Sequence, residues 1–140
     1  MSVDLRGVFV PCTSPFDSTT GELDVIGLET NLDSYLNHPV RGIVVGGSTG
    51  EAVLLDESER CEMLRVTKRK LGAGHLLIAG TGAESTRLTI SRCGEAADLG
   101  ADVVLVQPPA FYRGAMTELA LMKHYSEVAH VLAPLLKIDQ

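Results

Sequence analysis

The sequence predicts an α/β fold in which parallel strands alternate with helices. Short β-branched runs recur between longer segments whose apolar residues repeat with helical spacing, which is the pattern of successive βα units. Two of the runs, residues 43–45 and 103–106, are apolar at every position, as expected for strands buried on both faces of a parallel sheet. Glycine-rich segments follow several of the runs and provide the turns into the next helices.

The strands and helices can be placed in chain order. Strands are expected where β-branched runs are bounded by glycine, proline or a polar turn, at residues 7–12, 42–46, 76–80 and 103–107. Helices are expected where the helical spacing is sustained, at residues 25–37, 57–71, 86–99 and 118–132. The side chains that precede them can cap their first amides, namely Asp24, Asp56, Ser85 and Thr117. Asp56 and Glu59 together match a capping box.

The last residues break this alternation. After Pro134, residues 135–138 resemble the start of a fifth strand. We expect residues 1–140 to form a single, partial domain whose tail, residues 131–140, departs from the preceding pattern. Pattern alone leaves two architectures open: a small open sheet of flavodoxin type, and part of a closed (β/α)8 barrel, which needs at least about 200 residues.

Composition narrows the class of partner. The chain is 45% hydrophobic and 21% charged with a net charge of −6, which is typical of a globular domain and argues against nucleic acid or a membrane surface as the partner. No apolar run reaches the ~18 residues that span a bilayer, and the N-terminus leaves no room for a leader, so a cytoplasmic location is expected. Cys12, Cys61 and Cys93 are odd in number and widely spaced, which predicts neither a disulfide framework nor a zinc site.

The first candidate site is the segment Gly46-Gly47-Ser48-Thr49-Gly50-Glu51, directly after a predicted strand. In parallel α/β folds the loops at the carboxyl ends of the strands form the ligand face. Glycines allow successive amides to converge on an anion, and the two hydroxyls add donors, so a substrate carboxylate fits this loop. A phosphate loop does not fit, because its lysine is absent. A plain glycine turn whose hydroxyls bond their own backbone explains the segment equally well.

The second candidate is the segment 107–114, which follows the fourth predicted strand and contains Phe111 and Tyr112. A tyrosine hydroxyl at this edge can relay protons in a dry pocket. The alternative is that both rings line the pocket or pack against a neighbouring subunit. The segment 80–86 is explained mainly as a turn with an N-cap.

The histidines and lysines form no recognisable catalytic motif. The four histidines share no spacing with an acid or thiol partner, and we expect them at the surface or at helix ends. Lys68, Lys70 and Lys123 lie on predicted helix faces, whereas a lysine that forms an imine needs a desolvated position at a strand end. Only Lys137 lies near a predicted strand end.

Six motifs, in order and spacing, resemble the dihydrodipicolinate synthase / N-acetylneuraminate lyase family of class I aldolases. They are Pro11-Cys12-Thr13-Ser14-Pro15-Phe16, Gly46-Gly47-Ser48-Thr49-Gly50-Glu51, Glu57-x-Glu59-Arg60, Ala79-Gly80-Thr81-Gly82-Ala83-Glu84-Ser85-Thr86, Gly100-Ala101-Asp102 and Pro108-Pro109-x-Phe111-Tyr112. The resemblance covers about residues 6–130. Within the family, Arg41-Gly42-Ile43-Val44-Val45 and Tyr112-Arg113-Gly114 are most similar to the 4-hydroxy-2-oxoglutarate aldolase branch.

This resemblance implies an architecture and a chemistry. The chain would form the N-terminal half, about four βα units, of a (β/α)8 TIM barrel that is usually tetrameric. The full-length enzyme would be a lyase acting on a pyruvate-type 2-oxo acid through a lysine Schiff base, with no metal or organic cofactor, because the protonated imine is the electron sink. Gly47, Ser48 and Thr49 would bind the substrate carboxylate, and Ser48 and Tyr112 would be the catalytic residues of a proton relay.

The sequence departs from the family pattern at two places. The tyrosine that a neighbouring subunit supplies to the relay aligns without gaps with Phe111, and Tyr112 is one position away. The relay hydroxyl is therefore missing here unless the loop shifts by one residue. The family's fifth-strand tyrosine and sixth-strand lysine have no counterpart here, where the chain has Leu136-Lys137-Ile138-Asp139-Gln140. We therefore expect the isolated 140 residues to be inactive, and expect the end at Gln140 to reflect a fragment, a splice form or a truncated gene model.

Two other functions compete with the aldolase. One is a non-catalytic half-barrel that associates with full-length subunits, since half a barrel exposes strand edges and apolar surface. The other is a small flavodoxin-like domain that binds an anion at residues 46–51, the Ser48 loop.

Overall fold

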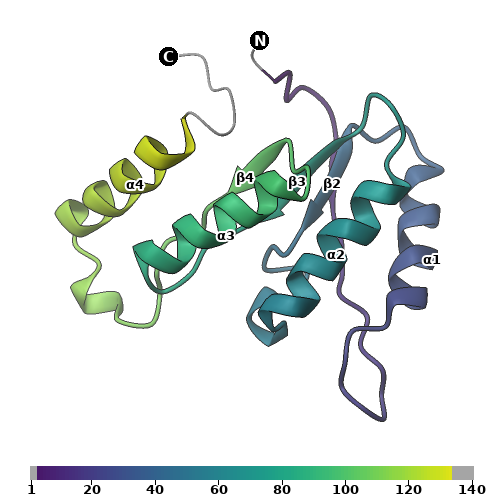
Figure 1. The fold of residues 1–140 in the computed structure, drawn as a ribbon, viewed down its shortest axis with the longest axis horizontal. Helices are drawn as coiled ribbons and strands as arrows, with labels where there is room; N and C mark the ends of the chain where they lie inside the picture. The colour runs from purple at the N-terminus through teal and green to yellow at the C-terminus, as the bar shows by residue number, and fades with distance from the viewer. Residues whose placement is uncertain (1–2, 134–140) are drawn as a thin grey trace.

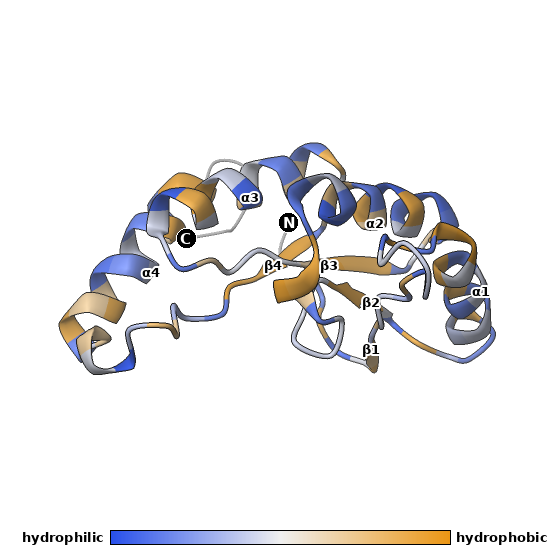
Figure 2. Ribbon diagram, turned by 90° about the horizontal axis from the view of Figure 1, so that it is seen from below, coloured by the Kyte–Doolittle hydropathy of each residue, from blue (hydrophilic) through white to orange (hydrophobic). Residues whose placement is uncertain are grey.

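Four parallel strands form one sheet, and the helices that connect them lie along one of its sides (Figures 1 and 2). The computed structural model describes residues 3–133. The expected fifth strand and Lys137 therefore lie outside the described residues. In chain order the elements are β1 (Phe9–Pro11), α1 (Val25–Leu36), β2 (Gly42–Val45), η1 (Ala52–Leu54), α2 (Glu57–Lys70), β3 (Leu76–Gly80), α3 (Thr86–Asp98), β4 (Val103–Leu105), η2 (Arg113–Ala115) and α4 (Glu118–Leu132).

The strand order distinguishes the two architectures that the sequence left open. The strands are hydrogen-bonded in the order β1-β2-β3-β4, so each strand is added on the same side of the one before it. A flavodoxin-like sheet starts with an inner strand and carries helices on both faces. Here α1, α2 and α3 lie above the same face of the sheet in Figure 2. Sequential winding with one helical layer is the arrangement of a sector of a barrel.

The helix-facing side of the sheet holds the main core. Ile43 and Leu77 are paired across β2 and β3 and are both fully buried. They pack with apolar residues of α1 and α2, including Leu28, Leu32 and Met63. A second, smaller cluster between α3 and α4 contains Cys93, Val128 and Leu132. The strands and helices are therefore held together by burial on this one side.

The opposite face of the sheet is less buried than the sequence predicted. Val44 and Ile78 face each other across β2 and β3 and are only half-buried, and Leu105 on β4 is 43% exposed. The expectation that residues 43–45 and 103–106 are buried on both faces is therefore wrong for this face. The physical reason is that the described residues supply only one layer of helices, so nothing in that part of the chain covers the second face.

The capping predictions are confirmed at all four helices. The side chains of Asp24, Ser85 and Thr117 accept hydrogen bonds from the third amide that follows each of them. Asp56 and Glu59 form the predicted capping box, in which each side chain accepts from the other's amide at 2.8 and 2.9 Å. These caps explain why all four helices start where the sequence placed them.

One histidine lies elsewhere than predicted. His124 on α4 is 5% exposed, and its Nδ1 lies 2.9 Å from the hydroxyl of Thr86 on α3. The expectation that it lies at the surface or a helix end is wrong, because His124, Val128 and Leu132 form the stripe of α4 that packs on α3. Its ring is part of that interface.

Candidate functional site

The loop between β2 and η1 takes its shape from glycine. Gly46 has a φ of +70°, a left-handed conformation that glycine adopts without strain. Gly80, at the end of β3, lies so close that a Cβ atom on it would be 2.0 Å from the carbonyl oxygen of Gly46. The hydroxyl of Ser14 donates to the carbonyl oxygen of Gly50 at 2.5 Å. The loop is therefore fixed against the ends of both neighbouring strands.

Two amides of this loop remain available to a ligand. The amides of Gly50 and Glu51 donate to the carbonyl oxygens of Gly47 and Ser48, both at 3.1 Å. The amides of Ser48 and Thr49 make no hydrogen bond within residues 3–133. Both side chains are exposed, whereas Gly47 is buried. Two amides and two hydroxyls can therefore meet an anion at the carboxyl edge of the sheet.

The second predicted segment lies on the loop that follows β4. Phe111 and Tyr112 are 77% and 70% exposed, and their rings meet edge to face with centroids 4.9 Å apart. The carboxylate of Glu84, from the β3–α3 loop, accepts hydrogen bonds from the amides of Ala110 and Phe111 at 3.1 and 3.0 Å. Glu84 thus attaches the aromatic loop to the neighbouring strand end.

The predicted residues share an edge of the sheet but lie on loops that follow different strands. Gly47, Ser48 and Thr49 follow β2, and Tyr112 follows β4, so parallel strands bring both loops to the carboxyl edge. β3 lies between them, which separates the two strands by roughly 10 Å at the usual strand spacing. No hydrogen bond joins Ser48 to Tyr112 within residues 3–133. Their cooperation in a proton relay is thus a proposal.

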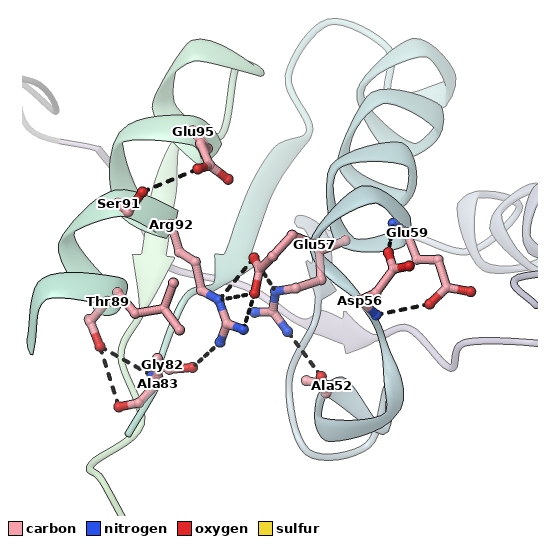
Figure 3. Close-up of polar contacts among 12 residues, drawn as sticks. Ala52, Asp56, Glu57, Glu59, Gly82, Ala83, Thr89, Ser91, Arg92 and Glu95 are labelled. Atoms are coloured by element: carbon pink, nitrogen blue, oxygen red, sulfur yellow. Dashed lines mark hydrogen bonds and ion pairs between the residues drawn. The ribbon is translucent and has the colours of Figure 1, made fainter. Parts of the chain in front are cut away.

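Three charged residues to which the sequence assigned no role support these loops from the helix side: Arg60, Glu57 and Arg92, of which Glu57 and Arg92 are labelled in Figure 3. Arg60 on α2 is 8% exposed and donates to the carbonyl oxygens of Ala52 and Gly80 at 3.0 and 2.7 Å. Arg92 on α3 donates to the carbonyl oxygen of Gly82 at 2.9 Å and to both carboxylate oxygens of Glu57.

Arg60 and Glu57 have shifted pKa values. Burial lowers the pKa of the Arg60 guanidinium, and repulsion from Arg92 lowers it further. The hydrogen bond from Arg92 lowers the pKa of Glu57. In the sequence, Glu57 and Arg60 were marked only by the motif Glu57-x-Glu59-Arg60, which is also typical of an ordinary charged helix face, and no motif marked Arg92.

A cleft of about 360 Å³ lies beside the predicted residues. It runs along the ends of β2, β3 and β4 and is lined by Gly46, Arg60, Gly80, Glu84, Arg92 and Ala110, among others. None of Gly47, Ser48, Thr49 and Tyr112 lines it. The cleft and the amide pair are therefore separate features of the same edge.

Among the described residues, no lysine lies at this edge, and the thiol of Cys12 is not available to a ligand. Cys12 is fully buried, and burial raises its pKa to about 11, so its thiol stays protonated at neutral pH. Lys68 and Lys70 pair with Asp102 and Asp33 at 3.5 and 2.8 Å on the helical layer, and Lys123 is exposed on α4. An amine that attacks a ligand at the Ser48 loop must come from outside residues 3–133.

Neither a metal-binding cluster nor a membrane-spanning helix is found within residues 3–133. No group of three or more His, Cys, Asp or Glu side chains in this part of the chain is arranged to hold a metal ion. None of its helices combines the length and apolar character needed to cross a membrane.

Comparison with known proteins decides the family. The sequence profile of the dihydrodipicolinate synthetase family matches residues 4–136. The chain belongs to this family. The matched range contains every site residue discussed above and extends slightly beyond the expected 6–130.

Relatives within the family include enzymes of two names. The chain is 42% identical over 127 residues to a probable mitochondrial 4-hydroxy-2-oxoglutarate aldolase of Emericella nidulans, covering 88% of this chain and 41% of that protein. It is 32% identical over 129 residues to the 4-hydroxy-tetrahydrodipicolinate synthase of Staphylococcus carnosus, covering 92% and 42%. The chain spans about two-fifths of the length of the curated relatives it matches.

Solved structures of the family share the fold. The dihydrodipicolinate synthase of Acinetobacter baumannii, solved with pyruvate, is 32% identical with a TM-score of 0.84, over 91% of this chain and 43% of that one. A dihydrodipicolinate synthase family protein of Coccidioides immitis is 31% identical with a TM-score of 0.82, over 89% and 40%. The predicted fold, the N-terminal part of a TIM barrel, is thereby confirmed.

Proposed function

We propose that this chain supplies the carboxylate-binding half of a lyase that makes or breaks a carbon–carbon bond of a 2-oxo acid through a lysine Schiff base. The observation that carries the proposal is the exposed pair Ser48 and Thr49 at the carboxyl edge of the sheet, whose amides and hydroxyls make no hydrogen bond within residues 3–133. Membership of the family supports it, as does the 42% identity to a relative named for 4-hydroxy-2-oxoglutarate.

The proposed chemistry follows from where charge develops. The Ser48 loop holds the carboxylate while an amine adds to the adjacent ketone and water leaves, giving a protonated imine. For 4-hydroxy-2-oxoglutarate, breaking the C3–C4 bond sends its electron pair into the imine and leaves an enamine. The C4 hydroxyl loses its proton and becomes the aldehyde of glyoxylate. Protonation of the enamine at C3 and hydrolysis release pyruvate and the amine.

We assign the movement of these protons to hydroxyl groups at the carboxyl edge. Ser48 and Tyr112 are the candidates that the described residues offer, one on each of two loops. Phe111 has no hydroxyl, so the relay depends on Tyr112 in this chain. Because the resemblance places a neighbouring subunit's ring at this point, we also propose a homo-oligomer, a tetramer, for the complete enzyme.

Carboxylate binding is tested first, with the chain itself. Pyruvate is titrated into the ¹⁵N-labelled protein while the amide resonances of Ser48 and Thr49 are followed. We expect these two amides to shift in a saturable manner, and expect Ser48→Ala and Thr49→Val to weaken the response severalfold. Ser126→Ala, an exposed serine on α4, is the matched control and should bind like the wild type. Saturable shifts confined to other loops would contradict the proposal.

Schiff-base formation is tested separately. The described lysines lie on the helical layer or are exposed on α4, so we expect the 140-residue chain to gain no mass when it is treated with pyruvate and borohydride. A pyruvate adduct on Lys137 would overturn the assignment of the amine to another segment.

A non-catalytic role is the second candidate, favoured by the half-covered sheet and by β1 and β4, which each pair on one side only within residues 3–133. In that case the chain associates with full-length family members. Size-exclusion chromatography with and without a full-length homologue distinguishes the two, since mixed oligomers are expected only for the second role. A cytoplasmic location for the protein is likewise a proposal, and fluorescence microscopy of a tagged chain tests it.

A further inference from the structure

We propose that Arg60, Glu57 and Arg92 form a positioning triad that sets the geometry of the Ser48 loop for the carboxylate of a 2-oxo acid. This inference rests on the proposed function. It adds three positioning residues, none of which belongs to the loop that would touch the substrate.

Arg60 links the ends of two strands. Its guanidinium donates through Nη1 to the carbonyl oxygen of Ala52, 3.0 Å away, and through Nη2 to that of Gly80, 2.7 Å away. Ala52 closes the Ser48 loop, since its own amide donates to the carbonyl oxygen of Gly47 at 3.4 Å. One buried side chain thus joins the end of the β2 loop to the end of β3.

Glu57 and Arg92 extend this link to the next loop (Figure 3). A carboxylate oxygen of Glu57 lies 3.9 Å from Nε of Arg60. The same carboxylate accepts from Nε of Arg92 at 3.0 and 3.1 Å. Nη1 of Arg92 donates to the carbonyl oxygen of Gly82 at 2.9 Å. Two planar guanidinium groups therefore hold three backbone carbonyls, those of Ala52, Gly80 and Gly82. The carboxylate between them fixes the two guanidinium groups relative to each other.

The arrangement is costly if its only purpose is stability. Burying a guanidinium removes its hydration, and apolar residues of similar volume often stabilise a core as well or better. What apolar residues cannot do is hold a carbonyl in a chosen direction. The amides of Ser48 and Thr49 have no partner within residues 3–133, so their direction depends on how the two ends of the loop are held. The first residue, Gly46, lies against Gly80, whose carbonyl oxygen Arg60 holds, and Ser14 and Arg60 hold the last residues at Gly50 and Ala52.

The triad acts from behind the loop. Glu57 and Arg60 come from α2 and Arg92 from α3, on the helix side of the sheet, and all of their strongest contacts are with backbone carbonyls or with one another. Ser48 and Thr49 are exposed. These three residues therefore position the binding atoms and are not catalytic residues.

The test measures pyruvate binding by the Ser48 and Thr49 amides in variants of the whole 140-residue chain. Arg60→Met removes both carbonyl contacts, and we expect about a tenfold loss of pyruvate affinity, or about 1.4 kcal/mol. Arg60→Lys keeps the charge and can reach one carbonyl, so it should recover part of the loss. Arg65→Met is the control: Arg65 lies on the same helix in an exposed pair with Glu62, and its replacement removes the same charge.

Arg92→Met is the second variant, in case Arg60→Met does not fold. It releases Gly82 and Glu57 but leaves Arg60 in place, so we expect a smaller loss of affinity with a dispersed, native-like spectrum. Wild-type affinity in folded Arg60→Met and Arg92→Met, or an equal loss in Arg65→Met, overturns the triad while the proposed function stands. Absence of any Ser48 or Thr49 response in the wild type is a different result, because it overturns the carboxylate site itself and leaves the triad nothing to position.

Discussion

Two buried threonines show how differently the same side chain is satisfied in this fold. Thr67 on α2 and Thr89 on α3 are both fully buried. The hydroxyl of Thr89 accepts from the amide of Ala83 at 3.1 Å and donates to the carbonyl oxygen of Ser85 at 3.1 Å. The hydroxyl of Thr67 has no partner within residues 3–133. A buried polar group without a partner lowers stability, because its bond to water is lost and not replaced.

The pair yields a prediction at this scale. Thr67→Val replaces the unpaired hydroxyl with a methyl group of similar size, and we expect the free energy of unfolding to rise by about 1 kcal/mol. Thr89→Val removes bonds that hold the start of α3, and we expect it to fall by about 1–3 kcal/mol. Urea unfolding followed by circular dichroism measures both. Equal losses in the two variants would mean that Thr67 has a hydrogen-bond partner in solution.

Single residues were predictable from the sequence only where the backbone signals their role. Ser48 and Thr49 stood out because glycines flank them directly after an apolar strand. Arg60 and His124 did not, because a charged or polar residue on a helix is usually solvated, and burial depends on neighbours distant in the sequence. Whether Tyr112 takes the relay position that aligns with Phe111 also depends on the loop that Glu84 holds, which no local pattern reveals.

At the scale of elements, a close approach of two backbones joins the ends of β2 and β3. Gly46 and Gly80 meet backbone to backbone, and the site loop begins at this contact. By contrast, Gly94 in the middle of α3 has no atom within 4 Å of where its Cβ would lie. The two glycines therefore differ in what a methyl group would meet.

We expect opposite effects from the same substitution at these glycines. Gly80→Ala places a methyl group 2.0 Å from the carbonyl oxygen of Gly46, so the strands must separate, and stability should fall by about 3 kcal/mol. Gly94→Ala adds a helix-favouring residue in open space and should raise stability by about 0.5–1 kcal/mol. Thermal unfolding of the two variants measures both effects. A neutral Gly80→Ala would show that β2 and β3 are less tightly joined than described.

The elements themselves were the most predictable part of the fold. All four helices begin at the predicted residue because side-chain caps define their starts. The outer strands are shorter than predicted: β1 is Phe9–Pro11 within the expected 7–12, and β4 is Val103–Leu105 within 103–107. In the described part of the chain each pairs on one side only, so its ladder ends sooner than the apolar run in the sequence.

For the whole molecule, the spacing of apolar residues could not predict the order in which the strands join the sheet. Both a doubly wound sheet and a barrel produce the same alternation of strands and helices, because they differ only in where each new strand is added. The order β1-β2-β3-β4 with helices on one side gives the barrel arrangement. It also explains why Val44 and Ile78 are apolar although they are only half-buried here: they belong to a face that a closed barrel would bury.

That face leads to a prediction about the chain in solution. Leu105 is 43% exposed on β4, next to the half-buried apolar residues of the open face, and β4 is an edge strand of the sheet formed by residues 3–133. Apolar surface beside an unpaired edge favours association between chains. We expect the 140-residue chain to self-associate as its concentration rises, and expect Leu105→Lys to shift it toward monomer, because association would then bury a charge. Sedimentation velocity over a wide range of concentration measures the change.

Leu119→Lys provides the matched control for this experiment. Leu119 is 75% exposed on α4, so the same substitution adds the same charge away from the sheet. It should leave self-association unchanged if the open face of the sheet is the contact. A shift toward monomer in Leu119→Lys with none in Leu105→Lys would instead assign the contact to α4, and the free sheet edge would then have no part in association.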